Sequence, residues 1–183
     1  MTLEATRTSR PALEAASPAE FREAMSSLAS GVVIVTSWLG GRPWGTTVTS
    51  FVSVSAEPPT ILVSLCSETT SARAIDDAGA FGASILGRQH WAAARHGAAP
   101  GAAKFLERFT DPSHLGLNPS IAGALAHLDC DVVERVEVAD HTIFIGRVRA
   151  ARVAADRGAP LLYFRRAYRT LTPPSNPSTI RRP

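Results

Sequence analysis

Apolar and polar residues alternate along several stretches of the chain, with the period of two that is typical of half-buried β-strands. Together with short apolar runs, this pattern predicts seven strands: residues 32–37, 46–55, 60–65, 80–86, 126–138, 142–153 and 160–164. Three short helices are expected, one after Ser17, one ending at 78 and one over 88–95. The connections are hairpin-like and show no repeated strand-helix-strand order, which favours a mainly β fold, a β-barrel with short helices, over a doubly wound sheet.

The first helix carries strong start signals. Ser17 suits the N-cap, Pro18 suits the first helical position, and Glu20 completes a capping box. Gly31 is a plausible C-terminal cap. An apolar stripe with helical spacing follows the capping box, and we expect it to pack into the core: Phe21, Met25 and Leu28.

The strand at 46–55 is rich in hydroxyl side chains. Alternation places Val48, Val52 and Val54 on a face that packs, while Ser50 breaks the alternation. The opposite face can form hydrogen bonds and carries Thr47, Thr49, Ser53 and Ser55. The simpler interpretation is the wet face of an antiparallel strand, where threonine is common. The alternative is one wall of a ligand site.

Hydroxyl residues also gather at 67–71, where the strand 60–65 leads into the second helix. A helix N-terminus offers free backbone N–H groups and the positive end of the helix dipole, which suit a phosphate. Simple capping by Thr69 to Ser71 is the competing interpretation, and Gly79 is expected to end this helix. The segment 97–120, rich in glycine and proline, is expected to be a lid or a binding loop.

Length and composition indicate one globular domain. The chain has 183 residues, 45% of them hydrophobic and 19% charged. We expect a disordered segment at 1–16, a domain at 17–171 and a flexible tail at 172–183 that contains four prolines. Residues 1–16 lack the pattern of a signal peptide and no apolar run is long enough to cross a bilayer, so a cytoplasmic protein without membrane contact is expected.

Positive charge is concentrated near the C-terminus. From residue 147 onward there are nine arginines and one acidic residue, whereas the preceding part has fifteen acidic and ten basic residues. The partner of this basic part is expected to be anionic. A nucleic-acid or acidic-partner binding module remains an alternative, although the aromatic residues interleaved with the arginines are few for base stacking.

Several other classes of site find no support in the sequence. Cys66 and Cys130 are too few for a disulfide scaffold, and the five histidines form no pair with metal-ligand spacing, so no metal is predicted. There is neither a GxGxxG nor a GxxxxGK[ST] motif, and Ser84 has the wrong context for a nucleophile elbow. Acidic pairs such as Asp129 and Asp131 are expected on solvated faces.

Three ordered segments carry a resemblance to a known family. They are residues 21–36, residues 45–55 followed by Pro58-Pro59, and the segment Asp140-His141-Thr142-Ile143-Phe144-Ile145-Gly146. Together they resemble the flavin reductase-like family over about residues 20–170, nearly the whole domain. The resemblance implies the FMN-binding split β-barrel fold.

The resemblance also implies an activity. Members are NAD(P)H:flavin oxidoreductases that transfer hydride from NADH to FAD or FMN and release reduced flavin to a partner monooxygenase. It further implies a homodimer, a loosely bound flavin, and NADH in preference to NADPH, with NADPH still possible. A flavin-binding barrel protein without reductase activity is the first alternative.

The site residues are likewise implied by the resemblance. Thr47, Val48, Thr49 and Ser50 would border the flavin ring and ribityl chain, with Ser64, Leu65 and Cys66 as the floor. The phosphate would lie among Ser67, Thr70 and Ser71, the nicotinamide beside His141, and the dinucleotide near Arg166 and Tyr168.

The sequence departs from the family pattern at the proposed flavin site. The family usually has asparagine at position 49 and a basic residue near 67 or 70, so Lys104 or the C-terminal arginines would have to compensate the phosphate charge.

Overall fold

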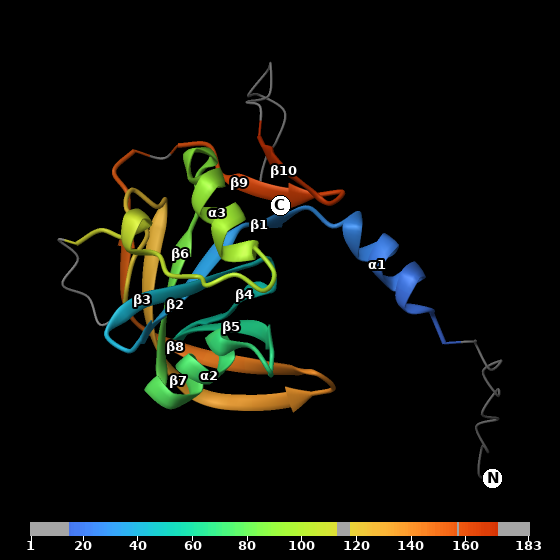
Figure 1. The fold of residues 1–183 in the computed structure, drawn as a ribbon, viewed down its shortest axis with the longest axis horizontal. Coiled ribbons are helices and arrows are strands. Elements are labelled where there is room, and N and C mark those ends of the chain that lie inside the picture. The colour runs from blue at the N-terminus through green and yellow to red at the C-terminus, as the bar shows by residue number, and fades with distance from the viewer. Residues whose placement is uncertain (1–14, 113–117, 157, 172–183) are drawn as a thin grey trace, which may run out of the picture.

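The computed structural model describes residues 15–112, 118–156 and 158–171, and these form the mainly β structure in Figure 1. The helices of the described residues are α1 (Pro18–Ser26), α2 (Thr70–Ala78) and α3 (Trp91–Ala98), with short 3-10 turns at Arg88–His90 and Glu107–Phe109. The first five strands are β1 (Ser30–Gly31), β2 (Val33–Leu39), β3 (Arg42–Val48), β4 (Phe51–Ala56) and β5 (Pro59–Cys66). The other five are β6 (Ala80–Ile85), β7 (Ala126–Val138), β8 (His141–Val153), β9 (Leu161–Phe164) and β10 (Ala167–Thr170).

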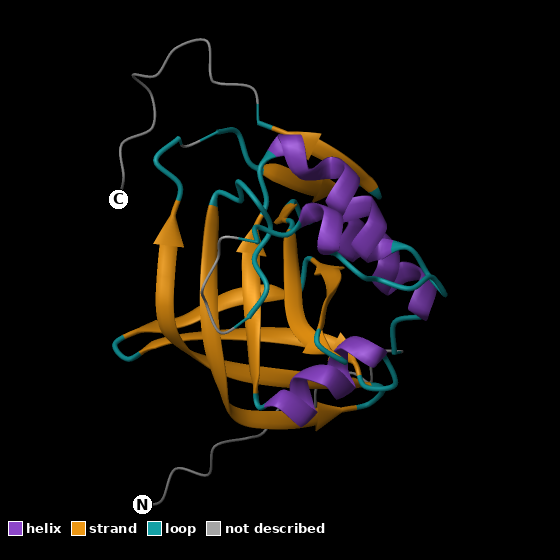
Figure 2. Cartoon of the chain, turned by 60° about the vertical axis from the view of Figure 1, so that its left-hand side comes forward, coloured by secondary structure: helices purple, strands orange, loops and turns teal. Residues whose placement is uncertain are grey.

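Seven strands form one antiparallel sheet in the order β3-β2-β6-β7-β8-β5-β4. The two edge strands, β3 and β4, are consecutive in the chain and are joined through Thr49 and Ser50. The sheet therefore curls until its edges meet at this short link, and Figure 2 shows the resulting barrel from the side. Because the edge strands share a link but no ladder of hydrogen bonds, the barrel is split at this point. The predicted β-barrel with short helices is confirmed.

A second, three-stranded sheet in the order β1-β9-β10 lies at one end of the barrel beside α3 (Figure 1). Neither β1 nor β10 was predicted from the sequence pattern, and β1 has only two residues. The turn between β9 and β10 is tight, because Arg165 and Arg166 both have positive φ angles of 48° and 60°. Two consecutive residues with positive φ angles are what the favoured two-residue hairpin turn requires.

Strand β2, which lies between β3 and β6, explains why the core has two parts. Its apolar run is buried on both faces, so alternate residues enter different clusters. Val33 and Val35 pack inside the barrel with Val63, Phe81 and Phe144. On the other face, a second cluster lies beneath α3 and contains Val32, Ile34, Leu86, Ala94, Leu106 and Leu161.

Helix α1 corrects one expectation. The capping box of Ser17 and Glu20 is present, but the helix ends at Ser26, before the expected cap at Gly31. No residue of α1 is buried, and the predicted core stripe is exposed: Phe21 by 62%, Met25 by 47% and Leu28 by 58%. The stripe predicts an apolar face correctly, but that face stays largely exposed, since α1 extends to the side of the barrel in Figure 1.

The hydroxyl-rich strand is also interrupted. It divides at Thr49 and Ser50 into β3 and β4, and the link reverses which residues face inward. Val48 and Phe51 pack against the core, whereas Val52 and Val54 are 52% and 53% exposed. The expectation that all three valines share a packing face is therefore wrong, because regular alternation holds only within an unbroken strand.

Asp129 gives a further correction. It was expected on a solvated face, but only 3% of it is exposed. Its Oδ1 accepts hydrogen bonds from the backbone N–H of Asn118 at 3.0 Å and from Asn118 Nδ2 at 3.3 Å. Buried carboxylates need such partners, and here they come from a segment eleven residues away.

The expected end segments lie mostly outside the described residues, which exclude 1–14 and 172–183. In the part of the chain that the structure describes, no helix is long and apolar enough to cross a membrane.

Candidate functional site

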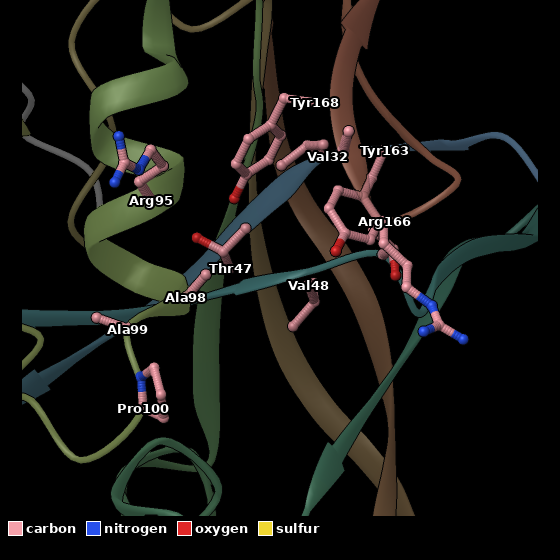
Figure 3. Close-up of a pocket in the computed structure, with 12 residues that line it drawn as sticks. Val32, Thr47, Val48, Arg95, Ala98, Ala99, Pro100, Tyr163, Arg166 and Tyr168 are labelled. Carbon is pink, nitrogen blue, oxygen red and sulfur yellow. The ribbon is translucent and has the colours of Figure 1, made fainter. Parts of the chain in front are cut away.

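The link between β3 and β4 lines two adjoining cavities. The larger has a volume of about 530 Å³ and the smaller about 300 Å³, and Thr47, Val48 and Thr49 line both. In Figure 3 the larger cavity lies between α3 on one side and the β9–β10 hairpin on the other. An elongated ligand can therefore lie in both cavities along one continuous wall.

Most hydroxyl groups of this wall hold the protein together. Thr47 Oγ1 donates to the carbonyl oxygen of Ala94 on α3 at 2.7 Å, and Ser50 Oγ donates to the carbonyl oxygen of Ser64 on β5 at 2.7 Å. Thr49 is exposed and lines both cavities, and its hydroxyl has no hydrogen-bond partner among the described residues. Thr49 is thus the hydroxyl of the wall that is available to a ligand.

The floor of the smaller cavity comes from β5 and the start of α2. Ser64, Leu65 and Cys66 line it together with Thr69. Thr69 is the N-cap of α2: its Oγ1 accepts from the N–H of Ala72 at 3.2 Å and donates to the carbonyl oxygen of Cys66 at 2.8 Å. The positive end of the α2 dipole therefore lies at the edge of this cavity.

Two tyrosines form one side of the larger cavity. The rings of Tyr163 on β9 and Tyr168 on β10 meet edge to face, with centroids 5.5 Å apart (Figure 3). Burial raises the pKa of the Tyr168 phenol and Tyr163 adds to this, while the positive charge of Arg95 acts in the opposite direction. The Tyr168 hydroxyl is accordingly a neutral donor at physiological pH.

Three cationic side chains lie at the two cavities. Arg95 and Arg166 line the larger one from opposite sides (Figure 3), and Arg166 forms a 3.1 Å ion pair with Glu23 of α1. Lys104 lines neither cavity, but its Nζ donates to Oγ1 of Thr46, a lining residue of the smaller cavity, at 3.2 Å. Partial burial lowers the pKa of Lys104. The site as a whole therefore suits an anionic ligand with a planar polar part.

The decisive comparison is with a protein family. A family model described as "Flavin reductase like domain" matches residues 25–172. The chain belongs to this family. The match covers the whole barrel and both cavities, and the family predicted from the sequence is confirmed.

Proteins similar to this flavin reductase family member carry names that agree with the family. It is 37% identical over 158 residues to the reductase component of a 4-nitrophenol 4-monooxygenase/4-nitrocatechol 2-monooxygenase from Rhodococcus opacus, covering 86% of this chain and 83% of the relative. It is 35% identical over 165 residues to an NADH:riboflavin 5'-phosphate oxidoreductase from Streptomyces pristinaespiralis, covering 89% and 93%. A solved NADH:FAD oxidoreductase from Streptomyces globisporus, in complex with NAD and FAD fragments, has a TM-score of 0.79 and 29% identity over 90% of this chain and all of that one.

In this family member the fold brings together many of the site residues expected from the sequence. The cavity linings contain Thr47, Val48, Thr49, Ser50, Ser64, Leu65, Cys66, Arg166 and Tyr168. They come from three strands, the β3–β4 link and the β9–β10 turn, so the curl of the sheet, and not their order in the chain, assembles them.

Other expected residues lie beside the cavities. Ser67 Oγ is 2.8 Å from Thr142 Oγ1, and Thr70 is exposed. Ser71 is buried and its Oγ accepts from the indole N–H of Trp44 at 3.0 Å. His141 pairs with Cys66 in the β5–β8 ladder, which places it next to a residue that lines the smaller cavity.

Sequence reasoning missed Arg95, Tyr163 and Thr69 as lining residues. Tyr163 and Tyr168 lie on adjacent strands of a hairpin whose second strand was not predicted. Arg95 lies on α3, which was expected to end at this residue but continues to Ala98. The N-cap pattern identified Thr69 as a helix start, and only the structure shows that this start borders a cavity.

Among the described residues, no group of three or more histidine, cysteine, aspartate or glutamate side chains is arranged to hold a metal ion.

Proposed function

We propose that this chain is an NADH:flavin oxidoreductase that reduces FAD or FMN and releases the reduced flavin. The observation that carries the proposal is the shared wall of Thr47, Val48 and Thr49, which joins a hydroxyl-lined cavity to a cavity lined by arginine and tyrosine. The hydroxyl-lined cavity suits the flavin, and the cavity lined by arginine and tyrosine suits the anionic nicotinamide dinucleotide.

The residues at the site fit this group. The exposed Thr49 hydroxyl and the backbone of the link can address the polar edge of the ring, while Lys104 and the α2 N-terminus offer positive potential to a phosphate. Burial makes the ammonium of Lys104 easier to deprotonate, and a nearby phosphate would reverse this effect. Lys104 thus supplies charge that positions 67 and 70 lack.

The reaction requires no nucleophile from the protein. Hydride passes from C4 of the nicotinamide to N5 of the flavin, so the two bound molecules supply the chemistry. The protein holds the rings in register, and the wall between the cavities serves that purpose because hydrogen bonds from Thr47 and Ser50 fix it to α3 and β5.

His141 is proposed to act on the nicotinamide side. Its Nδ1 lies 2.7 Å from Asp140 Oδ1, and this hydrogen bond lowers the pKa of the Asp140 carboxyl group. The carboxylate therefore orients the imidazole ring next to a lining residue of the smaller cavity, where it can face the dinucleotide or the negative charge that develops on reduced flavin.

A partner monooxygenase is proposed as the acceptor of the reduced flavin. Two relatives are named as reductase components, one of the 4-nitrophenol enzyme and one of a 4-hydroxyphenylacetate 3-monooxygenase from Thermus thermophilus, 34% identical over 156 residues. Use of NADPH and location in the cytoplasm stay predictions from the sequence.

A homodimer is also proposed. The exposed residues Phe21, Met25 and Leu28 line a groove of about 490 Å³ together with Val52, and this groove continues to the site through Thr49. A second copy covering this apolar face would border the flavin site. Light scattering on the purified chain tests this, since a monomer at micromolar concentration would contradict it.

One assay separates the candidate functions. Purified protein is mixed with NADH and excess FAD or FMN, and the loss of nicotinamide absorbance is followed. Turnover supports the reductase. Flavin retention without turnover would instead support a flavin-binding protein, and salt-sensitive oligonucleotide binding with neither activity would support a nucleic-acid module.

A further inference from the structure

We propose that Trp44 is a positioning residue for the flavin phosphate: it holds the first turn of α2 and the segment that carries Lys104 in one fixed arrangement, and so makes the enzyme prefer phosphorylated flavins to riboflavin. This inference rests on the proposed function, which places Lys104 and the α2 N-terminus at that phosphate. Trp44 lines neither cavity, and neither the sequence pattern nor the family resemblance singled it out.

The first contact of Trp44 is with α2. The tryptophan is 8% exposed, and its indole N–H donates to Oγ of Ser71 at 3.0 Å. Ser71 is 4% exposed and is the second residue of α2, in the turn that follows the N-cap Thr69. Because a buried indole N–H needs an acceptor, this hydrogen bond fixes the first turn of α2 relative to β3.

The second contact of Trp44 is with the segment that carries Lys104. The backbone N–H of Gly45 donates to the carbonyl oxygen of Lys104 at 3.1 Å, and Trp44 and Phe105 form an isolated β-bridge. The indole and the Phe105 ring meet edge to face with centroids 5.0 Å apart, and the Arg42 guanidinium lies 3.7 Å from the centre of the Phe105 ring. Two side chains of β3 therefore hold Phe105, and the adjacent Lys104 is held with it.

These contacts direct two positive groups to one cavity. Nζ of Lys104 donates to Oγ1 of Thr46 at 3.2 Å, and Thr46 lines the smaller cavity together with Thr69, the N-cap of α2. An ammonium group and a helix N-terminus attract the same kind of anion. A phosphate gains from both groups at once only if their separation is fixed, and Trp44 contacts both elements.

The ligand chemistry that this arrangement selects is a ribityl phosphate. FMN and FAD carry phosphate at the end of the ribityl chain, whereas riboflavin ends there in a neutral hydroxyl group. Loss of the hydrogen bond from Trp44 to α2 should therefore weaken the binding of phosphorylated flavins and spare riboflavin. A general loss of packing would instead weaken the binding of every flavin.

The experiment compares the wild type with Trp44→Phe, Ser71→Ala and Trp91→Phe. Trp44→Phe keeps an aromatic ring against Phe105 and removes the donor to Ser71, and Ser71→Ala removes the acceptor of the same hydrogen bond. Trp91 is the matched control, because it is a tryptophan on α3 that is 52% exposed and lines neither cavity. With NADH, kcat and KM are measured for FMN and riboflavin. Calorimetric titration with each flavin gives a Kd that is independent of turnover.

We expect Trp44→Phe and Ser71→Ala each to raise KM and Kd for FMN by about fivefold to tenfold, and to leave kcat, KM and Kd for riboflavin within about twofold of the wild type. Trp91→Phe should change neither flavin. Wild-type riboflavin kinetics in the same variants also shows that they are folded.

Equal rises of KM for FMN and riboflavin would show that Trp44 supports only the fold, and would overturn the inference. An unchanged KM and Kd for FMN in both variants, or a wild type that binds FMN and riboflavin equally, would overturn it as well. Failure of the proposed function is distinct, since the wild type would then show no turnover with either flavin.

Discussion

Thr47 on β3 and Gly97 in α3 approach so closely that a methyl group cannot fit between them: a Cβ atom at Gly97 would lie 2.5 Å from Thr47 Oγ1. The same hydroxyl donates to the carbonyl oxygen of Ala94 at 2.7 Å. This contact fixes α3 against the wall of the proposed flavin site, on one side of the larger cavity.

We predict that Gly97→Ala weakens flavin binding. The added methyl group must displace either the Thr47 side chain or the helix, which costs about 1–3 kcal/mol of overpacking, partly offset by the higher helix propensity of alanine. KM for flavin should rise several-fold, measured by steady-state kinetics. Gly31→Ala is the control, because no atom lies within 4 Å of the Cβ position there. Equal effects of both substitutions would contradict the prediction.

Lys104 should titrate at lower pH than a free lysine. Burial lowers its pKa in the folded protein, so the unfolded chain binds this proton more tightly. The unfavourable contribution of Lys104 to folding is therefore fully present below its folded pKa and disappears as the pH rises towards the ordinary lysine range.

The measurement is direct because Lys104 is the only lysine in the chain. Reductive methylation with 13C-labelled formaldehyde labels it together with the N-terminus, and NMR then gives the pKa of the modified amine. We expect FMN to raise this pKa, since a phosphate nearby favours the charged form. A pKa that does not change when FMN saturates the protein would exclude Lys104 from phosphate binding.

His141→Ala is expected to lower kcat/KM for NADH by about tenfold, the size expected for one charge-directed contact. The same substitution should raise the pKa of Asp140, because the hydrogen bond from His141 is the main reason that this pKa lies below its usual range. Steady-state kinetics and a carboxyl NMR titration test the two effects. If His141→Ala kept the wild-type kcat/KM for NADH, His141 would have no role in the reaction.

The contribution of Asp140 to stability has a defined pH window. Its pKa is depressed in the folded state, so its stabilising effect is present above the ordinary carboxyl pKa and is lost as the pH falls through the lower folded pKa. In His141→Ala this acid-dependent contribution should be smaller, because only the backbone hydrogen bond of Asp140 then lowers its pKa.

Replacing Asp129 should lower the free energy of unfolding far more than replacing Asp131, although both residues lie on β7. Asp129→Ala leaves the buried N–H of Asn118 without its acceptor, which should lower the free energy of unfolding by about 2–3 kcal/mol. Asp131→Ala removes only a partly exposed ion pair with Arg149 and should cost less than about 1 kcal/mol. Denaturant unfolding measures both, and similar losses would show that the buried contact is unimportant.

Local sequence patterns predicted the bounds of those elements that depend only on their own strand alternation or capping residues. The alternation over 126–138 gives β7 with its observed bounds, and Thr69 and Gly79 begin and end α2 as expected. In these segments the local preference agrees with the fold.

Failures of prediction concern relations between distant segments. The apolar stripe of α1 gives no information on whether another element covers it, and Phe21 is exposed. Likewise Val52 alternates correctly with its neighbours but faces outward, because the link at Thr49 and Ser50 resets the pattern. Arg95 and Tyr168 are far apart in sequence and share a cavity only because the hairpin β9–β10 lies beside α3.

The most direct test of the central claim is anaerobic mixing of the purified chain with NADH and excess FAD or FMN. The account predicts that flavin absorbance bleaches and that one NADH is oxidised for each flavin reduced, over many turnovers of the protein. Oxidised flavin that persists beside unreacted NADH, at a protein concentration where flavin binding is demonstrated, would contradict it.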